Sequence, residues 1–169
     1  MITGNAIGLP TVVLHPGYVC VPPAPARLCV VAAAGVAVTV YDRFRRRGGM
    51  GYYLHPRRRR GHSSTLFAAP AIVSLLEAFL GSGSRAEHLE TGLYGGAENP
   101  DAPGYDPGRA LANIAVAREV MRKMGVLPGA TDIGGFRARK VAFHTESGET
   151  MVARVTIVRS ADWYPPLPV

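Results

Sequence analysis

The sequence lacks the features that mark membrane-spanning and secreted proteins. Its longest mostly apolar run extends only from Leu28 to Tyr41, and a helix needs roughly 20 apolar residues to cross a bilayer. The N-terminal segment MITGNAIGLP has neither the basic nor the apolar part of a secretory signal. We therefore expect a cytoplasmic protein with no membrane insertion.

Metal ligands and redox-active groups are equally sparse. The chain has two cysteines, Cys20 and Cys29, which we expect to be reduced thiols in the core. Its histidines show no i, i+4 pairing, the spacing that lets two imidazoles on one helix share a metal. They are His15, His55, His62, His88 and His144. The pattern predicts no metal site and no cofactor.

Charged residues are few and unevenly placed. They make up 18% of the chain, below the roughly 25% usual in soluble proteins. The stretch from Arg43 to Arg60 contains no acidic residue. Its basic residues are Arg43, Arg45, Arg46, Arg47, Arg57, Arg58, Arg59 and Arg60. Taking these eight from the 19 Lys and Arg leaves 11 bases against 12 acids, so the net charge of +7 is confined to this stretch.

Turn residues and short apolar segments predict the fold class. The chain contains 20 glycines and 14 prolines, which favour short elements joined by turns. β-Branched and alternating segments predict strands at 11–14, 18–21, 28–41, 48–55, 89–94, 141–145 and 150–158. The long link between 28–41 and 48–55 suits a hairpin, and so does the turn between the last two segments.

Two helices complete the predicted fold. The first ends at Gly81 and begins either at the candidate caps Ser63 and Ser64 or near Pro70. The second begins with Asp106 as its cap and Pro107 in its first turn, with Leu111, Ile114, Met121 and Met124 inward. Between them, 97–108 reads as a polar loop long enough to be functional or mobile.

We expect one layered α+β domain, with the two helices packed on mostly antiparallel strands. Its predicted span is 11–158. A flexible start over 1–10 precedes it, and a proline-rich tail over 159–169 follows it.

Three groups of residues then follow one another in a specific order and spacing. The first is His15-Pro16-Gly17 with the apolar run that ends at Tyr41-Asp42, and the second is 48–56 (GGMGYYLHP). The third comprises Gly95-Gly96-Ala97, Asn113, Asp132-Ile133-Gly134-Gly135, Arg137, Arg139 and Lys140. Together these groups resemble the chemoreceptor glutamine deamidase family, CheD, of bacterial chemotaxis. The resemblance covers about residues 12–156.

This resemblance implies an α/β/β layered fold and deamidation of receptor glutamines by a cysteine nucleophile, a histidine base and a supporting threonine. Counted from the matching segments, the cysteine position falls on Gly35 and the histidine position on Tyr52. Glycine offers no nucleophile, and a phenol with a pKa near 10 is a poor base at neutral pH. The segment 31–38 (VAAAGVAV) contains no Cys, Ser, Thr or Asp, so no small shift of register restores a nucleophile.

The leading hypothesis is therefore a family member that binds chemoreceptor cytoplasmic helices, or the CheC-type phosphatase with which the family pairs, without deamidating. One alternative is a working deamidase whose catalytic groups have moved, with Cys29 or Thr39 acting with His55. Another is a basic nucleic-acid-binding domain, which the lack of interleaved aromatic residues and of a recognised motif disfavours. The eight arginines are solvated loop residues or a docking rim for an acidic partner.

Overall fold

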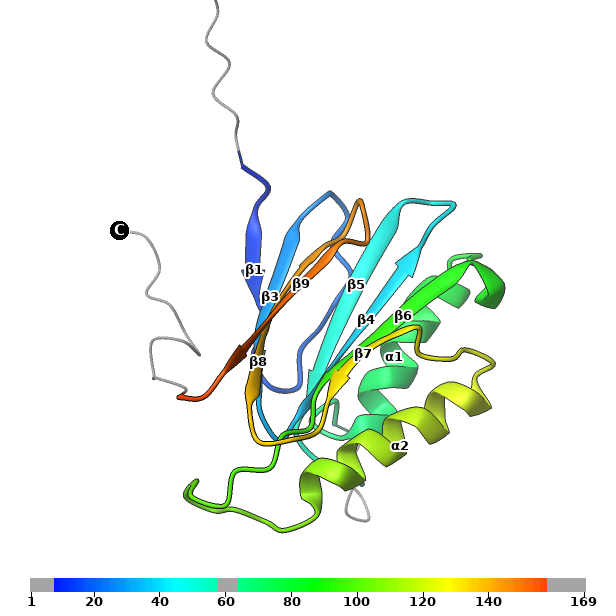
Figure 1. The fold of residues 1–169 in the computed structure, drawn as a ribbon. Coiled ribbons are helices and arrows are strands. Elements are labelled where there is room, and N and C mark those ends of the chain that lie inside the picture. The colour runs from blue at the N-terminus through cyan, green and yellow to red at the C-terminus, as the bar shows by residue number, and fades with distance from the viewer. Residues whose placement is uncertain (1–7, 58–63, 158–169) are drawn as a thin grey trace, which may run out of the picture.

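The structure is a computed structural model that describes residues 8–57 and 64–157, and it has three layers (Figure 1). One sheet has the order β1-β3-β8-β9 and the other the order β2-β5-β4-β6-β7. The strands are β1 (Thr11–Val13), β2 (Val19–Cys20), β3 (Arg27–Ala32), β4 (Val36–Asp42), β5 (Arg47–Tyr53), β6 (Leu89–Gly95), β7 (Ala130–Ile133), β8 (Ala138–His144) and β9 (Thr150–Val155). The helices α1 (Ala68–Leu80) and α2 (Arg109–Lys123) cover the five-stranded sheet, and a short 3-10 helix (Ala86–His88) precedes β6. The expected α+β fold is confirmed.

Alternation along β4 creates two cores. Val36, Val38 and Val40 pack against the helices, whereas Ala37 and Tyr41 belong to the core between the two sheets. This follows from the two-residue period of a strand. The central strand β4 lies antiparallel to both β5 and β6, so most of its apolar side chains are buried on either face.

The predicted single strand over 28–41 is wrong. The chain forms β3 in one sheet and then β4 in the other, and 33–35 make the turn between them. One long buried strand and two shorter buried strands in different sheets are equally apolar. The composition of 28–41 therefore does not show that the chain turns at 33–35. The turn places Gly35 at the start of β4, directly beside the end of β5.

The helix starts also differ in part from expectation. α1 begins at Ala68 with Pro70 in its first turn, which confirms the second of the two predicted starts. α2 begins at Arg109 after Gly108, whose φ of 80° is left-handed, so the predicted Asp106 cap is wrong. Leu111, predicted to point inward, is 63% exposed. Ile114 and Met121 lie on the buried face of α2, as predicted.

No helix among the described residues is long and apolar enough to cross a membrane. Several predicted features lie outside the described residues: most of the N-terminal start, the tail over 159–169, Arg58–Arg60, and the candidates His62 and Ser63.

Candidate functional site

A cavity of about 510 Å³ opens where the turn between β3 and β4 meets the end of β5. Gly35 and Tyr52 both line it. A Cβ atom built on Gly35 would lie 2.8 Å from Cε2 of Tyr52, so the two positions indicated by the resemblance are in contact. Tyr52 is 1% exposed and packs in the core between the sheets.

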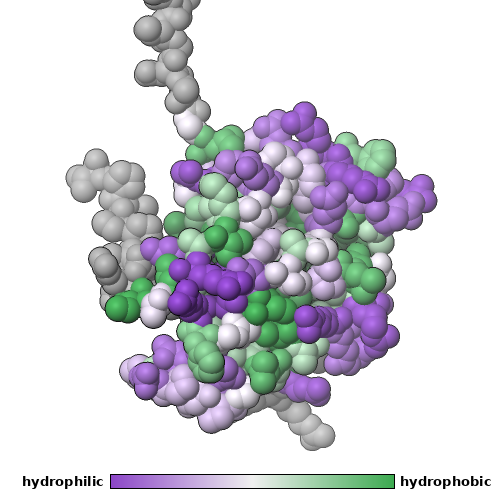
Figure 2. All heavy atoms as spheres, viewed as in Figure 1, coloured by the Kyte–Doolittle hydropathy of each residue, from purple (hydrophilic) through white to green (hydrophobic). Residues whose placement is uncertain are grey.

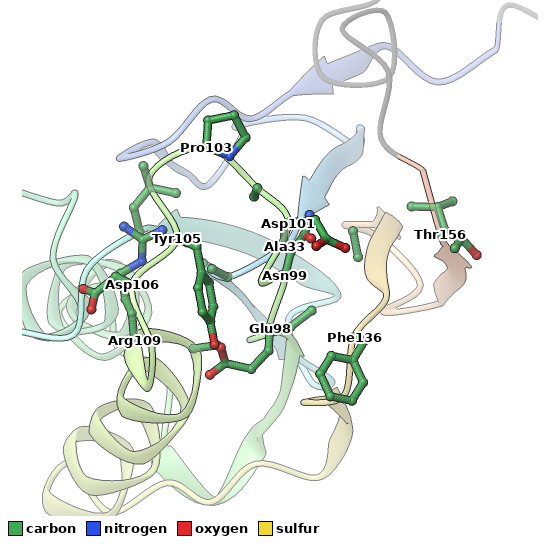
Figure 3. Close-up of a pocket in the computed structure, with 18 of the residues that line it drawn as sticks. Ala33, Glu98, Asn99, Asp101, Pro103, Tyr105, Asp106, Arg109, Phe136 and Thr156 are labelled. Carbon is green, nitrogen blue, oxygen red and sulfur yellow. The ribbon is translucent and has the colours of Figure 1, made fainter.

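The mouth of the cavity is formed by the loop between β6 and α2 and by the segment before β8 (Figure 3). Glu98, Asp101 and Tyr105 come from the loop, and Phe136 lies across from Tyr105. A hydrogen bond between Tyr105 and Glu98 is the main cause of the raised pKa of the Tyr105 phenol. Asp106 and Arg109 add an acid and a base at the same edge.

The chemistry available to the cavity is limited. Among its described lining residues there is no cysteine and no histidine. Carboxylates, one guanidinium, the Asn99 amide and the hydroxyls of Tyr52, Tyr105 and Thr156 remain. Such a set can bind polar groups by hydrogen bonds and charge, but it lacks the thiolate that a covalent mechanism uses as nucleophile.

The floor of the cavity is fixed from behind by α2. Asn113, which is fully buried, donates from Nδ2 to the carbonyl oxygens of Ala34 at 2.8 Å and Leu54 at 2.9 Å. The hydroxyl of Tyr53 donates to the carbonyl oxygen of Asn113 at 2.7 Å. These contacts join the β3–β4 turn, the end of β5 and the helix, so the cavity is built on rigid elements.

The Tyr53 hydroxyl should contribute measurably to stability. It is buried, and burial raises the pKa of Tyr53. Replacing Tyr53 with phenylalanine removes the donor and leaves the Asn113 carbonyl short of a partner, so we expect a loss of about 1–2 kcal/mol in the free energy of unfolding. Urea denaturation of Tyr53→Phe and of the unaltered chain measures this loss. Tyr18→Phe, at a site 56% exposed, is the control, and equal midpoints for the two variants would contradict the expectation.

The proposed relocated catalytic groups do not meet in this cavity. Cys29 pairs in register with Ala142 and lines a separate hollow of about 430 Å³ on the outer face of the four-stranded sheet. Burial raises the pKa of its thiol more than Arg27 lowers it, so the reactive thiolate is disfavoured. Thr39 lines a third hollow, and His55 a fourth in which its ring tilts against Phe67.

The first arginine cluster lies at the other end of the β4–β5 hairpin from Gly35 and Tyr52 (Figure 1). Hydrophilic residues gather over this end in Figure 2. Seven residues of β4 separate the two ends, about 23 Å at roughly 3.3 Å per residue. This cluster therefore does not border the cavity.

Contacts within the fold occupy much of that cluster. Arg45 donates to the carbonyl oxygen of Ser82 at 2.6 Å, and Arg47 donates to its hydroxyl at 3.2 Å. Arg47 also lies 5.5 Å from the centre of the Phe79 ring. The remaining two members have looser contacts: Arg43 lies 5.6 Å from the Phe44 ring, and Arg46 lies 3.9 Å from Glu146. The cluster ties the hairpin to the end of α1.

Arg57 is the described member of the second cluster. It is exposed and shares a small hollow with Asp106 and Arg109, both of which also line the cavity. Of the eight arginines, it is the one that the described structure places beside the cavity. No group of three or more His, Cys, Asp or Glu side chains suited to a metal occurs in the part of the chain that the structure describes.

Sequence reasoning missed the side chains at the cavity mouth. Glu98, Asp101 and Tyr105 belong to the polar loop that length and composition predict to be functional or mobile, but neither property shows which of its residues line the cavity. Phe136 lies outside that loop. Its neighbours belong to the third matching group, but that group does not single out Phe136 itself.

The comparisons with known proteins agree with this architecture. A family model described as CheD chemotactic sensory transduction matches residues 55–154. A probable chemoreceptor glutamine deamidase CheD of Geobacter sulfurreducens is 32% identical over 149 residues, covering 87% of this chain and 91% of that protein. A similarly named protein of Anaeromyxobacter dehalogenans is 30% identical over 150 residues, covering 88% and 86%. The family match spans more than half of the chain, and the relatives span most of it. The chain belongs to the CheD family.

Proposed function

We propose that this protein is a chemotaxis regulator of the CheD family that binds the cytoplasmic helices of a chemoreceptor without deamidating them. One observation carries the proposal: the cavity at the expected catalytic positions contains Gly35 against Tyr52, and none of its described lining residues has a thiol or an imidazole. We place its action in the cytoplasm, where such helices lie.

The chemistry of amide hydrolysis supports the inactive assignment. A cysteine mechanism needs a thiolate to attack the amide carbon and a group titrating near neutral pH to move the proton. Gly35 has no side chain, and Tyr52 is a buried phenol. Cys29, the nearest thiol in sequence, lies on the outer face of the other sheet and opens to a different hollow.

The binding role rests on what the cavity retains. Its volume of about 510 Å³ is within the roughly 300–1,000 Å³ range of small-molecule pockets, so it can admit individual side chains of a partner. Its floor is pinned through Asn113, and its mouth offers hydrogen-bonding and aromatic groups. The CheC-type phosphatase is the second partner that we propose, since a cavity without the dyad can still engage a protein surface.

The test separates chemistry from binding. The protein is incubated with a glutamine-bearing cytoplasmic receptor fragment, and ammonia release and the Gln-to-Glu mass change are followed. A CheD relative with both catalytic residues serves as the positive control. We expect no conversion by this protein, together with saturable binding of the fragment in calorimetry.

Either half of the proposal can fail separately. Conversion above the buffer blank would refute the inactive assignment, and its loss in Cys29→Ser or His55→Ala would then identify relocated groups. Absence of binding to both the receptor fragment and a CheC-type phosphatase would refute the regulator role.

A further inference from the structure

A groove between α1 and α2 has no lining residue in common with the cavity. We propose that it binds an acidic amphipathic helix of a partner protein. The groove has a volume of about 670 Å³ and is bordered by both helices and by the segment that carries Arg57. This inference goes beyond the proposed function and does not depend on it, because it concerns a different surface and different residues.

The floor of the groove is apolar and has helical spacing. Pro70 and Val73 on α1 are three residues apart, and Val116 and Val120 on α2 are four apart. Residues at these spacings form a ridge along one side of a helix. Two such ridges from helices that pack together leave a furrow between them that matches the apolar ridge of a third helix.

The described structure leaves part of this floor open. Pro70, Val73 and Val120 are only half-buried, even though they belong to helices whose opposite faces are packed in the core. When a partner covers apolar surface that would otherwise stay in water, the free energy of the complex is lowered. A helix with leucine or a similar residue at i, i+3, i+4 and i+7 would provide that cover.

The charged residues that line the groove carry a net positive charge. Arg57 and Lys123 line it, and both are exposed. The acid that lines it, Glu119, is already bound by Lys123 at 2.7 Å. That hydrogen bond is the main cause of the lowered pKa of Glu119, and Arg57 and Arg122 lower the pKa further. Because Lys123 is already paired with Glu119, the net positive charge among the lining residues of the groove comes from Arg57.

The charges and the apolar floor select one class of partner. Cations beside an apolar furrow favour a helix with carboxylates flanking its apolar stripe, because opposite charges then meet at the rim as apolar side chains meet at the floor. The phosphates of a nucleic acid could bind the cations, but a nucleic acid backbone has no apolar side chains to cover the floor of the groove. A basic helix would fit the floor and be repelled at the rim.

The experiment uses two synthetic helical peptides of equal length with the same leucines at i, i+3, i+4 and i+7. One carries glutamates beside the stripe and the other carries lysines. Binding of each labelled peptide to the full chain is followed by fluorescence anisotropy. We expect the glutamate peptide to bind at least about tenfold more tightly than the lysine peptide. This difference in affinity should shrink as the salt concentration rises, because exposed charges are screened.

Two variants place the binding on the groove. Val120→Asp puts a carboxylate on the floor and should weaken binding of the glutamate peptide by about tenfold or more. Arg57→Glu changes only an exposed rim charge, and it should weaken the glutamate peptide while strengthening the lysine peptide. Met151→Asp, at an exposed apolar residue of the four-stranded sheet, is the matched control and should bind as the unaltered chain does.

Three results would overturn the inference. The first is equal affinity for the two peptides, and the second is unchanged binding in both Val120→Asp and Arg57→Glu. The third is a chain that sediments as a dimer and becomes monomeric in Val120→Asp, because the occupant of the groove would then be a second copy. Arg57→Glu keeps the test decisive if Val120→Asp fails to fold.

Discussion

Replacing Asp132 with alanine should lower the free energy of unfolding by about 3 kcal/mol, the cost of leaving a buried charge without its partner. Asp132, on β7, accepts hydrogen bonds from Arg139 at 2.9 Å and 3.1 Å and forms an ion pair with Arg154 at 3.0 Å. Arg139 is 3% exposed. Because β7 belongs to one sheet and β8 and β9 to the other, this cluster also holds the sheets together.

An exposed ion pair provides the control for this prediction. Arg85 and Glu87 lie 2.5 Å apart, with side chains 68% and 62% exposed, and exposed pairs contribute about 1 kcal/mol or less. Glu87→Ala should therefore shift the urea midpoint far less than Asp132→Ala. Similar shifts for the two variants would mean that the cross-sheet cluster is no more stabilising than a surface pair.

The Asp132 carboxylate also makes the free energy of unfolding depend on pH. Burial by itself raises the pKa of Asp132, but hydrogen bonds and charge from Arg154 and Arg139 outweigh it and the net pKa is lowered. A carboxyl whose pKa is lower in the folded chain stabilises the fold above its unfolded pKa, near about 4, and this contribution is lost as pH falls through the folded value. Below about pH 4 the unaltered chain should lose more stability than Asp132→Ala does. Parallel losses would contradict this.

Gly35→Ala should cost about 2–3 kcal/mol of stability, as expected for overpacking against fixed neighbours. A Cβ atom at Gly35 would lie 2.5 Å from the carbonyl oxygen of Tyr53, 2.8 Å from the Tyr52 ring and 3.0 Å from the Leu54 side chain. The first contact is with backbone that β4 holds in register, so rotating a side chain does not relieve it. The chain around the turn has to move.

Gly129→Ala is the matched control, because a Cβ there would meet only the carbonyl oxygen of Thr91 at an ordinary 3.6 Å. Thermal or urea unfolding of both variants measures the difference. Equal stability of Gly35→Ala and Gly129→Ala would show that the turn accommodates a side chain freely.

The double change Gly35→Cys with Tyr52→His tests the same geometry with the residues that the resemblance implies at these positions. Replacing Tyr52 removes the ring contact but leaves the carbonyl oxygen of Tyr53 in place. We expect a destabilised chain with no deamidation of a receptor fragment. Turnover by this variant would show that the backbone can still adopt the catalytic arrangement.

Strand alternation and turn residues were sufficient to predict most of the elements. Val36, Val38 and Val40 alternate as a strand requires, and Gly81 ends α1 where expected. The prediction failed where apolar character carried no directional signal. The run 28–41 is equally apolar whether it stays in one sheet or crosses to the other. Leu111 is an apolar residue typical of a core, but it lies exposed on α2.

The candidate site was predicted in part for a related reason. The expected positions Gly35 and Tyr52 do meet at one cavity. Gly35 directly precedes β4 and Tyr52 lies on β5, and these two strands are neighbours in sequence that pair with each other. The cavity mouth depends on Glu98 and Phe136, which come from separate loops. How two loops approach each other is set by the packing of whole layers, which local patterns do not encode.

The close fit around Gly35 has an evolutionary consequence. Once the backbone of Tyr53 occupies the space that a side chain at Gly35 would need, a single codon change to cysteine yields an unstable protein before it yields an enzyme. A cysteine nucleophile at this position would therefore require the turn and the end of β5 to change first. Selection on stability alone would oppose that substitution, even where deamidation would be useful.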